Sequence, residues 1–398
     1  MTIAQTNAHR LPTNRDEHWK YAKLRGLDTH NFLAAIEPTT TTTSAVASVL
    51  PAKIPELTRV VLIDGYFSQH LSDPLPQGLS IKVKNTLPDN KKTRSARVVP
   101  QSVDYYFASL NSQHAAQVFE VRLSTQTRYT LEILCIATSG NSYPALDIEL
   151  YEGATLTLIE EHLNATLETS TLTNLSVMLT VGADAKIDYT RVQKQNFSAQ
   201  YFDTLEITLA DRAHCQLVSV ASGAAASRST VLLNHQGTNS ALQWQAASLA
   251  QGAQVNDAYV RITHSAPGAR TKQMFRGIAS GRAKIGFNGH MQVTADAPGS
   301  SADQSIKCLL TGVEAEANVR PQLEIYTDDV RATHGATVGK LDNNMLFYML
   351  SRGIPEVTAQ ALLKWAFIAD VIAKISLPLV REKIQQSLSA QFPGGAQE

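Results

Sequence analysis

Short runs of alternating apolar and polar residues dominate the middle of the chain. Between about residues 98 and 338 these runs are separated by Gly, Asn or Asp, and helical periodicity is almost absent. In one such run the two alternating sets are Leu156, Leu158 and Glu160, and Thr155, Thr157 and Ile159. Because successive side chains of a strand point to opposite faces, this pattern predicts an all-β region whose strands each bury one face.

A weak internal repeat runs through the same region. Turn-plus-strand units begin at Gly153, Gly182 and Asp211, each 29 residues after the one before. Similar turns recur at Gly252 and Gly312, away from that period. One turn per unit at this spacing predicts the coils of a β-solenoid, in which each coil buries its apolar face by stacking on the next. A sandwich or a propeller remains an alternative on pattern alone.

The last sixty residues are predicted to be helical. Asp342 is a good N-cap for an apolar helix, and Gly353 followed by Pro355 predicts its end. A second helix follows with an apolar stripe at helical spacing, and Pro378 opens a third. These stripes either pack on the β core or form a groove for a partner protein.

The N-terminal segment to about residue 36 contains apolar residues at mixed spacing, which predicts short helices; they are Trp19, Tyr21, Leu24, Leu27, Phe32 and Leu33. The Thr-rich run at residues 39–44 predicts a linker or a mobile loop. A basic stretch at residues 82–97 is interpreted as a solvated loop rather than an anion-binding patch; its cations are Lys82, Lys84, Lys91, Lys92, Arg94 and Arg97. The predicted units are residues 1–60, helical with the Thr-rich linker, residues 61–338, the β core, and residues 339–398, helical.

Composition narrows the function classes. Lysine plus arginine and aspartate plus glutamate each total 35, so no net field attracts nucleic acid or an anionic membrane. Charged residues make up 18%, compared with about a quarter in typical soluble domains, which leaves room for surfaces that another subunit covers. No apolar leader and no apolar run of about 18 residues is visible, which predicts a cytoplasmic protein. The three cysteines, Cys135, Cys215 and Cys308, lie too far apart for a metal knuckle, and their role stays open.

No familiar catalytic motif is present, and neither a phosphate loop nor a dinucleotide fingerprint occurs in the chain. Glu160, Glu161 and His162 are interpreted as surface polar residues, of which only Glu160 and His162 share a side of their strand. His264 and His290 are interpreted as structural histidines. His334 is set apart because it lies at the junction of the last strand and the helical tail, close to Gly335 and Gly339.

The segment PQLEIYTDDVRATHGATVGKLDNNMLFYMLSRGI, residues 321–354, resembles the signature of the SufB/SufD family of iron–sulfur cluster assembly scaffolds. Further similarities occur at residues 17–21, at residues 257–264 with 275–277, and at residues 303–310. The length, and the absence of the extra cysteines and longer N-terminal region of SufB, make the chain more similar to SufD. The resemblance implies a right-handed parallel β-helix core between helical ends.

The resemblance also implies partners and a site. Family members form SufB–SufD pairs through the C-terminal part of the β-helix, and a homodimer is expected in the absence of SufB. The helical tail is expected to dock the SufC ATPase; the expected contact residues are Ser351, Arg352, Gly353, Ile354, Leu363, Trp365, Phe367 and Ile368. His334 matches the family's interfacial histidine, a ligand for transient iron or a nascent cluster shared with SufB. Many relatives have a cysteine two residues earlier, where this chain has Ala332.

The resemblance implies a scaffold that is not an enzyme and has no ATP site of its own, and it leaves open whether a reduced flavin takes part. Two alternatives remain. One is a purely structural adaptor of the complex with no cluster contact. The other is a β-helix enzyme that acts on polysaccharides. Clustered carboxylates or an arginine base would indicate such an enzyme, and no clear carboxylate pair is visible in this sequence.

Overall fold

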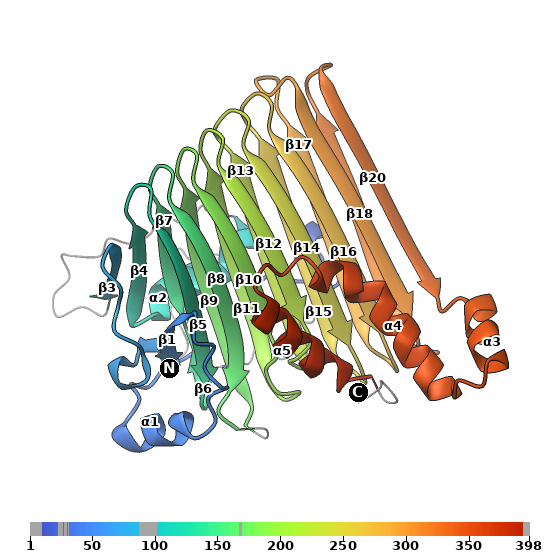
Figure 1. Cartoon of the computed structure of the whole chain (residues 1–398), viewed down its shortest axis with the longest axis horizontal. Helices are drawn as coiled ribbons and strands as arrows, with labels where there is room; N and C mark the ends of the chain where they lie inside the picture. The colour runs from blue at the N-terminus through green and yellow to red at the C-terminus, as the bar shows by residue number, and fades with distance from the viewer. Residues whose placement is uncertain are drawn as a thin grey trace.

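Two large sheets form the body of the protein, as a computed structural model shows (Figure 1). The structure describes residues 10–22, 27, 30, 32–86, 102–166 and 169–392. Sheet A contains, in spatial order, β2 (Tyr66–Phe67), β1 (Thr58–Ile63), β5 (Arg128–Ala137), β8 (Thr155–Asn164), β10 (Lys186–Gln193), β12 (His214–Ala221), β14 (Ala241–Ala250), β16 (Arg270–Ala279), β18 (Ser300–Leu310) and β20 (Val330–Lys340). Sheet B contains β19 (Glu316–Ile325), β17 (Lys284–Val293), β15 (Val255–His264), β13 (Ala226–His235), β11 (Gln200–Leu209), β9 (Thr171–Val181), β7 (Ala145–Leu150), β4 (Gln117–Leu123) and β3 (Leu79–Asn85), and β6 (Gly140–Ser142) pairs with β9.

From β7 onward successive strands alternate between the two sheets, and each strand pairs in parallel with the next strand of its own sheet. In sheet A the register runs from Lys186 to His214, then to Ala241 and Arg270, an advance of about 30 residues per coil. This is a parallel β-helix, which confirms the solenoid prediction and removes the sandwich and the propeller.

The turns between sheet B and sheet A stack as regularly as the strands. Gly153, Asp184 and Arg212 occupy equivalent turn positions with φ of 67°, 56° and 53°. The backbone N–H of each donates to a carbonyl of the next turn, as from Asp184 to Asp211 at 2.9 Å. The predicted turns near residues 153, 182 and 211 are therefore real coil boundaries, but the strand register aligns Gly153 with Asp184 and Arg212, 31 and 28 residues apart, and not at a constant 29. Gly and Asp suit the left-handed conformation of these turns, and Arg212 adopts it as well.

The space between the sheets is filled mainly by inward-facing apolar side chains. Leu156 and Leu158 of β8 lie in this core, followed by Ile187 of β10 and Leu217 of β12. All three cysteines are free thiols in the same core. Burial raises the pKa of Cys215 and of Cys308 to about 12, so these thiols stay protonated.

Helices other than α3 pack on the outer faces of the sheets. The helices are α1 (Thr40–Ala47), α2 (Tyr106–His114), α3 (Asn343–Ser351), α4 (Glu356–Ile372) and α5 (Pro378–Ser389), with short 3-10 turns at Glu17–Trp19, Gln69–Leu71 and Val103–Tyr105. Figure 1 shows α4 and α5 lying across sheet A, and their apolar stripes pack on Val218 and Ile278 of that sheet. Asp342 caps α3 through bonds from the N–H groups of Asn344 and Met345, as predicted.

The N-terminal part departs from the sequence predictions. The Thr-rich run forms α1, with Thr39 as its N-cap, so the expected linker is a helix that is held in place by Val46 packing on sheet A. Strand β1 begins just before the predicted β core of residues 61–338, while β2 and β3 lie inside it but before residue 98, where the alternating pattern starts. Helix α2, also inside the predicted core, is a departure from the all-β prediction. Residues 10–39 contain one described turn of 3-10 helix. Leu24, Lys91, Lys92, Arg94 and Arg97 lie outside the described residues, so the basic-loop prediction is not tested there.

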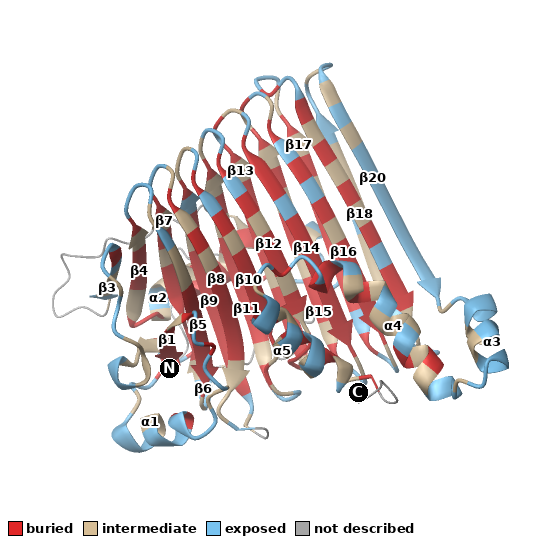
Figure 2. Cartoon of the chain, viewed as in Figure 1, coloured by how far each residue is buried: buried red, intermediate tan, exposed pale blue. Residues whose placement is uncertain are grey.

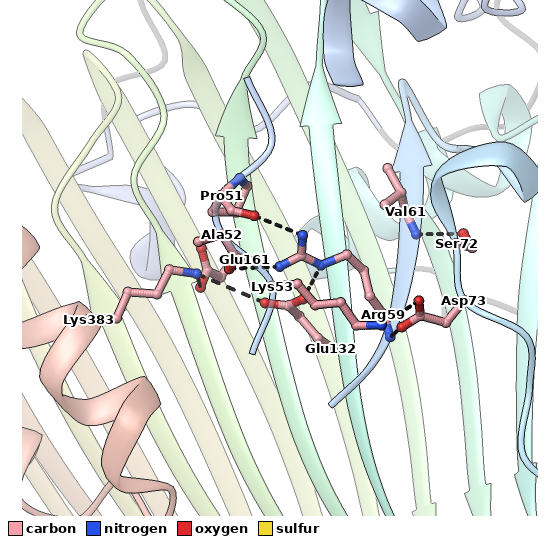
Figure 3. Close-up of polar contacts among 10 residues, drawn as sticks. All are labelled: Pro51, Ala52, Lys53, Arg59, Val61, Ser72, Asp73, Glu132, Glu161 and Lys383. Carbon is pink, nitrogen blue, oxygen red and sulfur yellow. Dashed lines mark hydrogen bonds and ion pairs between the residues drawn. The ribbon is translucent and has the colours of Figure 1, made fainter. Parts of the chain in front are cut away.

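An ion cluster fastens the tail to the first coils (Figure 3). The Nζ atom of Lys383, on α5, lies 2.6 Å from Oε1 of Glu161 and 4.0 Å from Oε1 of Glu132. The Nε atom of Arg59 donates to Oε2 of Glu132 at 2.5 Å. Both carboxylates are buried, so the positive charges of Lys383 and Arg59 take the place of water in compensating them. The cluster joins α5, β8, β5 and β1, four segments far apart in the sequence.

Candidate functional site: the open last coil and the helical tail

The two ends of the solenoid are finished differently. At the first coils, β2 and β3 pair antiparallel with β1 and β4 and close the sheets. At the other end, β20 is the last strand of sheet A and β19 the last of sheet B. Most residues of β20 are exposed, in contrast to the buried strands of the middle coils (Figure 2). The last coil is therefore an uncovered rim.

His334 lies in the middle of this rim. The residue is opposite Gln304 of β18 in the parallel register, at a position that faces the interior in the earlier coils. With no further coil above it, the ring of His334 is exposed, and none of the described residues forms a hydrogen bond or ion pair with it. Ala332, two residues earlier on the same face of the strand, leaves apolar surface beside the imidazole.

The described residues do not supply a complete metal site. No group of three or more His, Cys, Asp or Glu side chains in the described ranges could hold a metal ion. Cys308 lies opposite Val338 in the register, but its thiol is buried in the core. A metal ion at His334 would therefore need ligands from outside the described residues.

The tail divides into a docked part and a projecting part. Figure 1 shows α3 beyond the edge of β20, joined to α4 by the turn at Gly353, whose φ is 84°. Of the predicted docking residues, Ser351, Arg352 and Gly353 are exposed. Ile354, Leu363, Trp365 and Phe367 are half-buried. Ile368 is fully buried against sheet A, so it attaches α4 to the core.

The sequence reasoning did not assign the most exposed apolar residues of the tail to the docking surface. These are Met345, Phe347 and Tyr348 on α3 and Val357 on α4, with Phe347 at 74% exposure. The signal was present in the run MLFYML, which carries more apolar residues than one helical stripe needs. Such a patch on a projecting helix is typical of a protein–protein contact.

The interpretation of Glu160, Glu161 and His162 as surface residues is wrong. All three are buried, because the solenoid encloses one face of β8 and the tail covers the other. His162 Nε2 lies 2.8 Å from Oε1 of Glu160, and Arg191 Nε donates to the same oxygen at 3.1 Å. Burial would raise the pKa of Glu160, but Arg191 and then His162 outweigh it and lower the pKa to about 2. The prediction that Glu160 and His162 share a side is correct.

The two isolated histidines occupy structural positions. His264 is buried with Nε2 2.9 Å from the Thr271 hydroxyl, and His290 is half-buried 3.3 Å from Glu324. Both positions agree with the structural interpretation. Among the described residues, no helix has the length and apolar character needed to cross a membrane.

Comparison with known proteins gives consistent matches over most of the chain. A family model described as SUF system FeS cluster assembly, SufBD core domain, matches residues 134–367, which is more than half of the chain. The iron–sulfur cluster assembly protein SufD of Escherichia coli (strain K12) is 27% identical over 396 residues, covering 97% of this chain and 90% of that protein. An iron–sulfur cluster assembly SufBD family protein of Synechocystis is 25% identical over 399 residues, covering 96% and 88%. The chloroplastic protein ABCI7 of Arabidopsis thaliana is 25% identical over 346 residues, covering 82% and 72%.

Proposed function

The chain belongs to the SufB/SufD family of iron–sulfur cluster assembly proteins, and from this premise we propose that it is a scaffold subunit that works only in a complex. In this proposal it pairs with a SufB protein through its last coil, docks a SufC ATPase on its tail, and presents His334 to iron or a nascent cluster at the subunit interface. The chain itself carries out no ATP chemistry. Its three free thiols fit a reducing compartment, the cytoplasm.

The uncovered last coil is the observation that carries the proposal. An exposed edge strand has a row of unpaired backbone groups, and proteins normally shorten such strands, charge them or cover them. β20 has eleven residues, and its only charged side chains are Arg331 and Lys340 near its ends. A related solenoid could continue both sheets across this edge by strand pairing.

A charge in the middle of β20 tests the pairing. Thr337 is exposed on this strand, and Thr337→Lys places an ammonium group in the proposed interface without touching the core. We expect co-purification with co-expressed SufB to fall at least tenfold, while thermal unfolding of the isolated chain stays unchanged. Ser80→Lys, at an exposed position of β3 in the closed end, is the matched control. Equal SufB recovery with both variants would sink the pairing proposal.

The projecting helix α3 supports the proposed ATPase contact. Removing the whole tail is a poor test, because α4 and α5 cover apolar residues of sheet A that truncation would expose. Phe347→Ser instead removes one exposed ring, and we expect weaker SufC binding with unchanged stability. Val49→Ser removes an exposed apolar residue far from the tail and should leave SufC binding intact. SufC binding that is insensitive to Phe347→Ser argues against docking on α3.

His334 separates a cluster-contacting scaffold from a purely structural adaptor. Neutral imidazole is a suitable iron ligand, and thiolate or sulfide from outside this chain would complete the coordination. We expect His334→Ala to lower iron and sulfide in the reconstituted three-component complex several-fold without preventing its assembly. His70→Ala, which removes an exposed histidine near the first coils, is the control. Unchanged cluster yield with His334→Ala favours the adaptor.

A further inference from the structure

His334 ends a column of inward-facing residues that runs through sheet A. The register places these residues opposite one another from coil to coil, and they are Leu158, Tyr189, Leu217, Trp244, Gln273, Gln304 and His334. The column ends in two glutamines and the histidine. Amide side chains at two successive interior positions are unusual, because a buried amide must find partners.

The two glutamines bond to each other but leave one atom each without a partner. Gln304 Nε2 donates to Gln273 Oε1 at 2.5 Å. Gln304 is 3% exposed and Gln273 is 1% exposed. The Oε1 atom of Gln304 and the Nε2 atom of Gln273 are buried, and no described residue hydrogen-bonds to them. The amide nitrogen of Gln304 is bonded to β16, and the register places His334 of β20 on the other side of Gln304 from Gln273.

The Gln304 amide reaches close to the opposite sheet. A Cβ atom at Gly289 of β17 would lie 2.3 Å from Gln304 Nε2 and 2.8 Å from Cε1 of Phe287. The absence of a side chain at Gly289 therefore leaves room for the end of the Gln304 side chain where the structure places it.

We propose that Gln304 is the positioning residue for His334: its Oε1 atom accepts the hydrogen bond of one ring N–H. The ring is free to turn toward this acceptor because no described residue holds it. The bond selects one tautomer and leaves the lone pair of the other ring nitrogen directed to the open rim. Histidines that bind metals commonly donate their second N–H to such an acceptor, which sets ring orientation and basicity. The use of that lone pair for iron rests on the proposed function, whereas the hydrogen bond does not.

The tautomer of His334 is the direct test. Nitrogen NMR of the full chain labelled at histidine, recorded at pH 8, distinguishes the two tautomers of a neutral imidazole. His334→Ala assigns the resonance. We expect a single tautomer in the wild type, and a mixture in Gln304→Met, which keeps the length of the side chain but removes the acceptor. Gln304→Glu, which keeps an acceptor that Gln273 Nε2 can also reach, should restore the single tautomer.

Controls keep the test independent of folding and of the complex. Gln243→Met changes an exposed glutamine of β14 and should leave the His334 resonance as in the wild type. A mixed tautomer in the unaltered protein overturns the proposal even if Gln304→Met does not fold. A single tautomer that persists in folded Gln304→Met overturns it as well. If the tautomer depends on Gln304 but His334→Ala leaves cluster yield unchanged, the positioning stands and the role of His334 in cluster assembly fails.

Discussion

The ion cluster under α5 predicts that Lys383→Met destabilises the attachment of the tail. The variant keeps the aliphatic bulk of the side chain but leaves Glu161, which is 2% exposed, without its cation. Glu132 is fully buried and retains only Arg59. Removing one partner of a buried ion pair typically costs 3–5 kcal/mol. Because Lys383 itself is a quarter exposed, we expect the lower end, about 3 kcal/mol.

Hydrogen exchange of the α5 amides and urea unfolding together measure this cost. A loss of about 3 kcal/mol in local stability speeds exchange through opening of α5 by about 150-fold. Lys374→Met removes an exposed lysine of the same tail that has no ion pair among the described residues, and should change stability by less than about 0.5 kcal/mol. Adding Glu161→Gln to Lys383→Met should recover more than half of the loss, because the uncompensated charge is then gone. Equal exchange in the two lysine variants, or no recovery in the double variant, would refute the reasoning.

Three further predictions concern the stability of the fold. Burial lowers the pKa of His264 to about 4, while an unfolded imidazole titrates near 6.5. The folded state therefore binds fewer protons at His264 than the unfolded state does. The contribution of His264 to the free energy of unfolding should be fully present above pH 6.5 and fall by about 3 kcal/mol toward pH 4. His264→Gln should remove this contribution, which urea unfolding at several pH values measures. Trp19→Ala should cost about 3–5 kcal/mol in urea unfolding, because Trp19 is fully buried and its N–H donates to Asp104. Gly268→Ala should lower the thermal midpoint, with a loss of about 1–2 kcal/mol, because φ is 68° and the new Cβ would lie 2.4 Å from Asn239 Oδ1.

Local patterns predicted the solenoid well because they follow from short-range geometry. The turns at Gly153 and Gly182, the cap at Asp342 and the stop at Gly353 depend on backbone conformation and on hydrogen bonds within a few residues. Such features are visible wherever the sequence provides the right side chain. The position of His334 on the last strand follows from the same reasoning together with the family resemblance.

Burial was predicted less well, because it depends on segments far away in the sequence. Glu160 and His162 look like surface residues in a half-buried strand, yet sheet B closes over one face of β8. Glu161 faces the other way and is covered by Lys383, 222 residues later. The Thr-rich run lacks an apolar stripe, and α1 is held by the packing of Val46 on sheet A.

The sequence by itself determined the repeating coils, the breaks between them and the helical tail, because each is encoded in turn conformation and apolar spacing within one coil. Only the tertiary structure decided which end of the solenoid stays open, which charged groups are enclosed, and that Gln304 lies next to His334. Those facts depend on stacking between residues about 30 positions apart and on the tail, whose Lys383 covers Glu161 from 222 residues away. No local pattern records how such distant positions align.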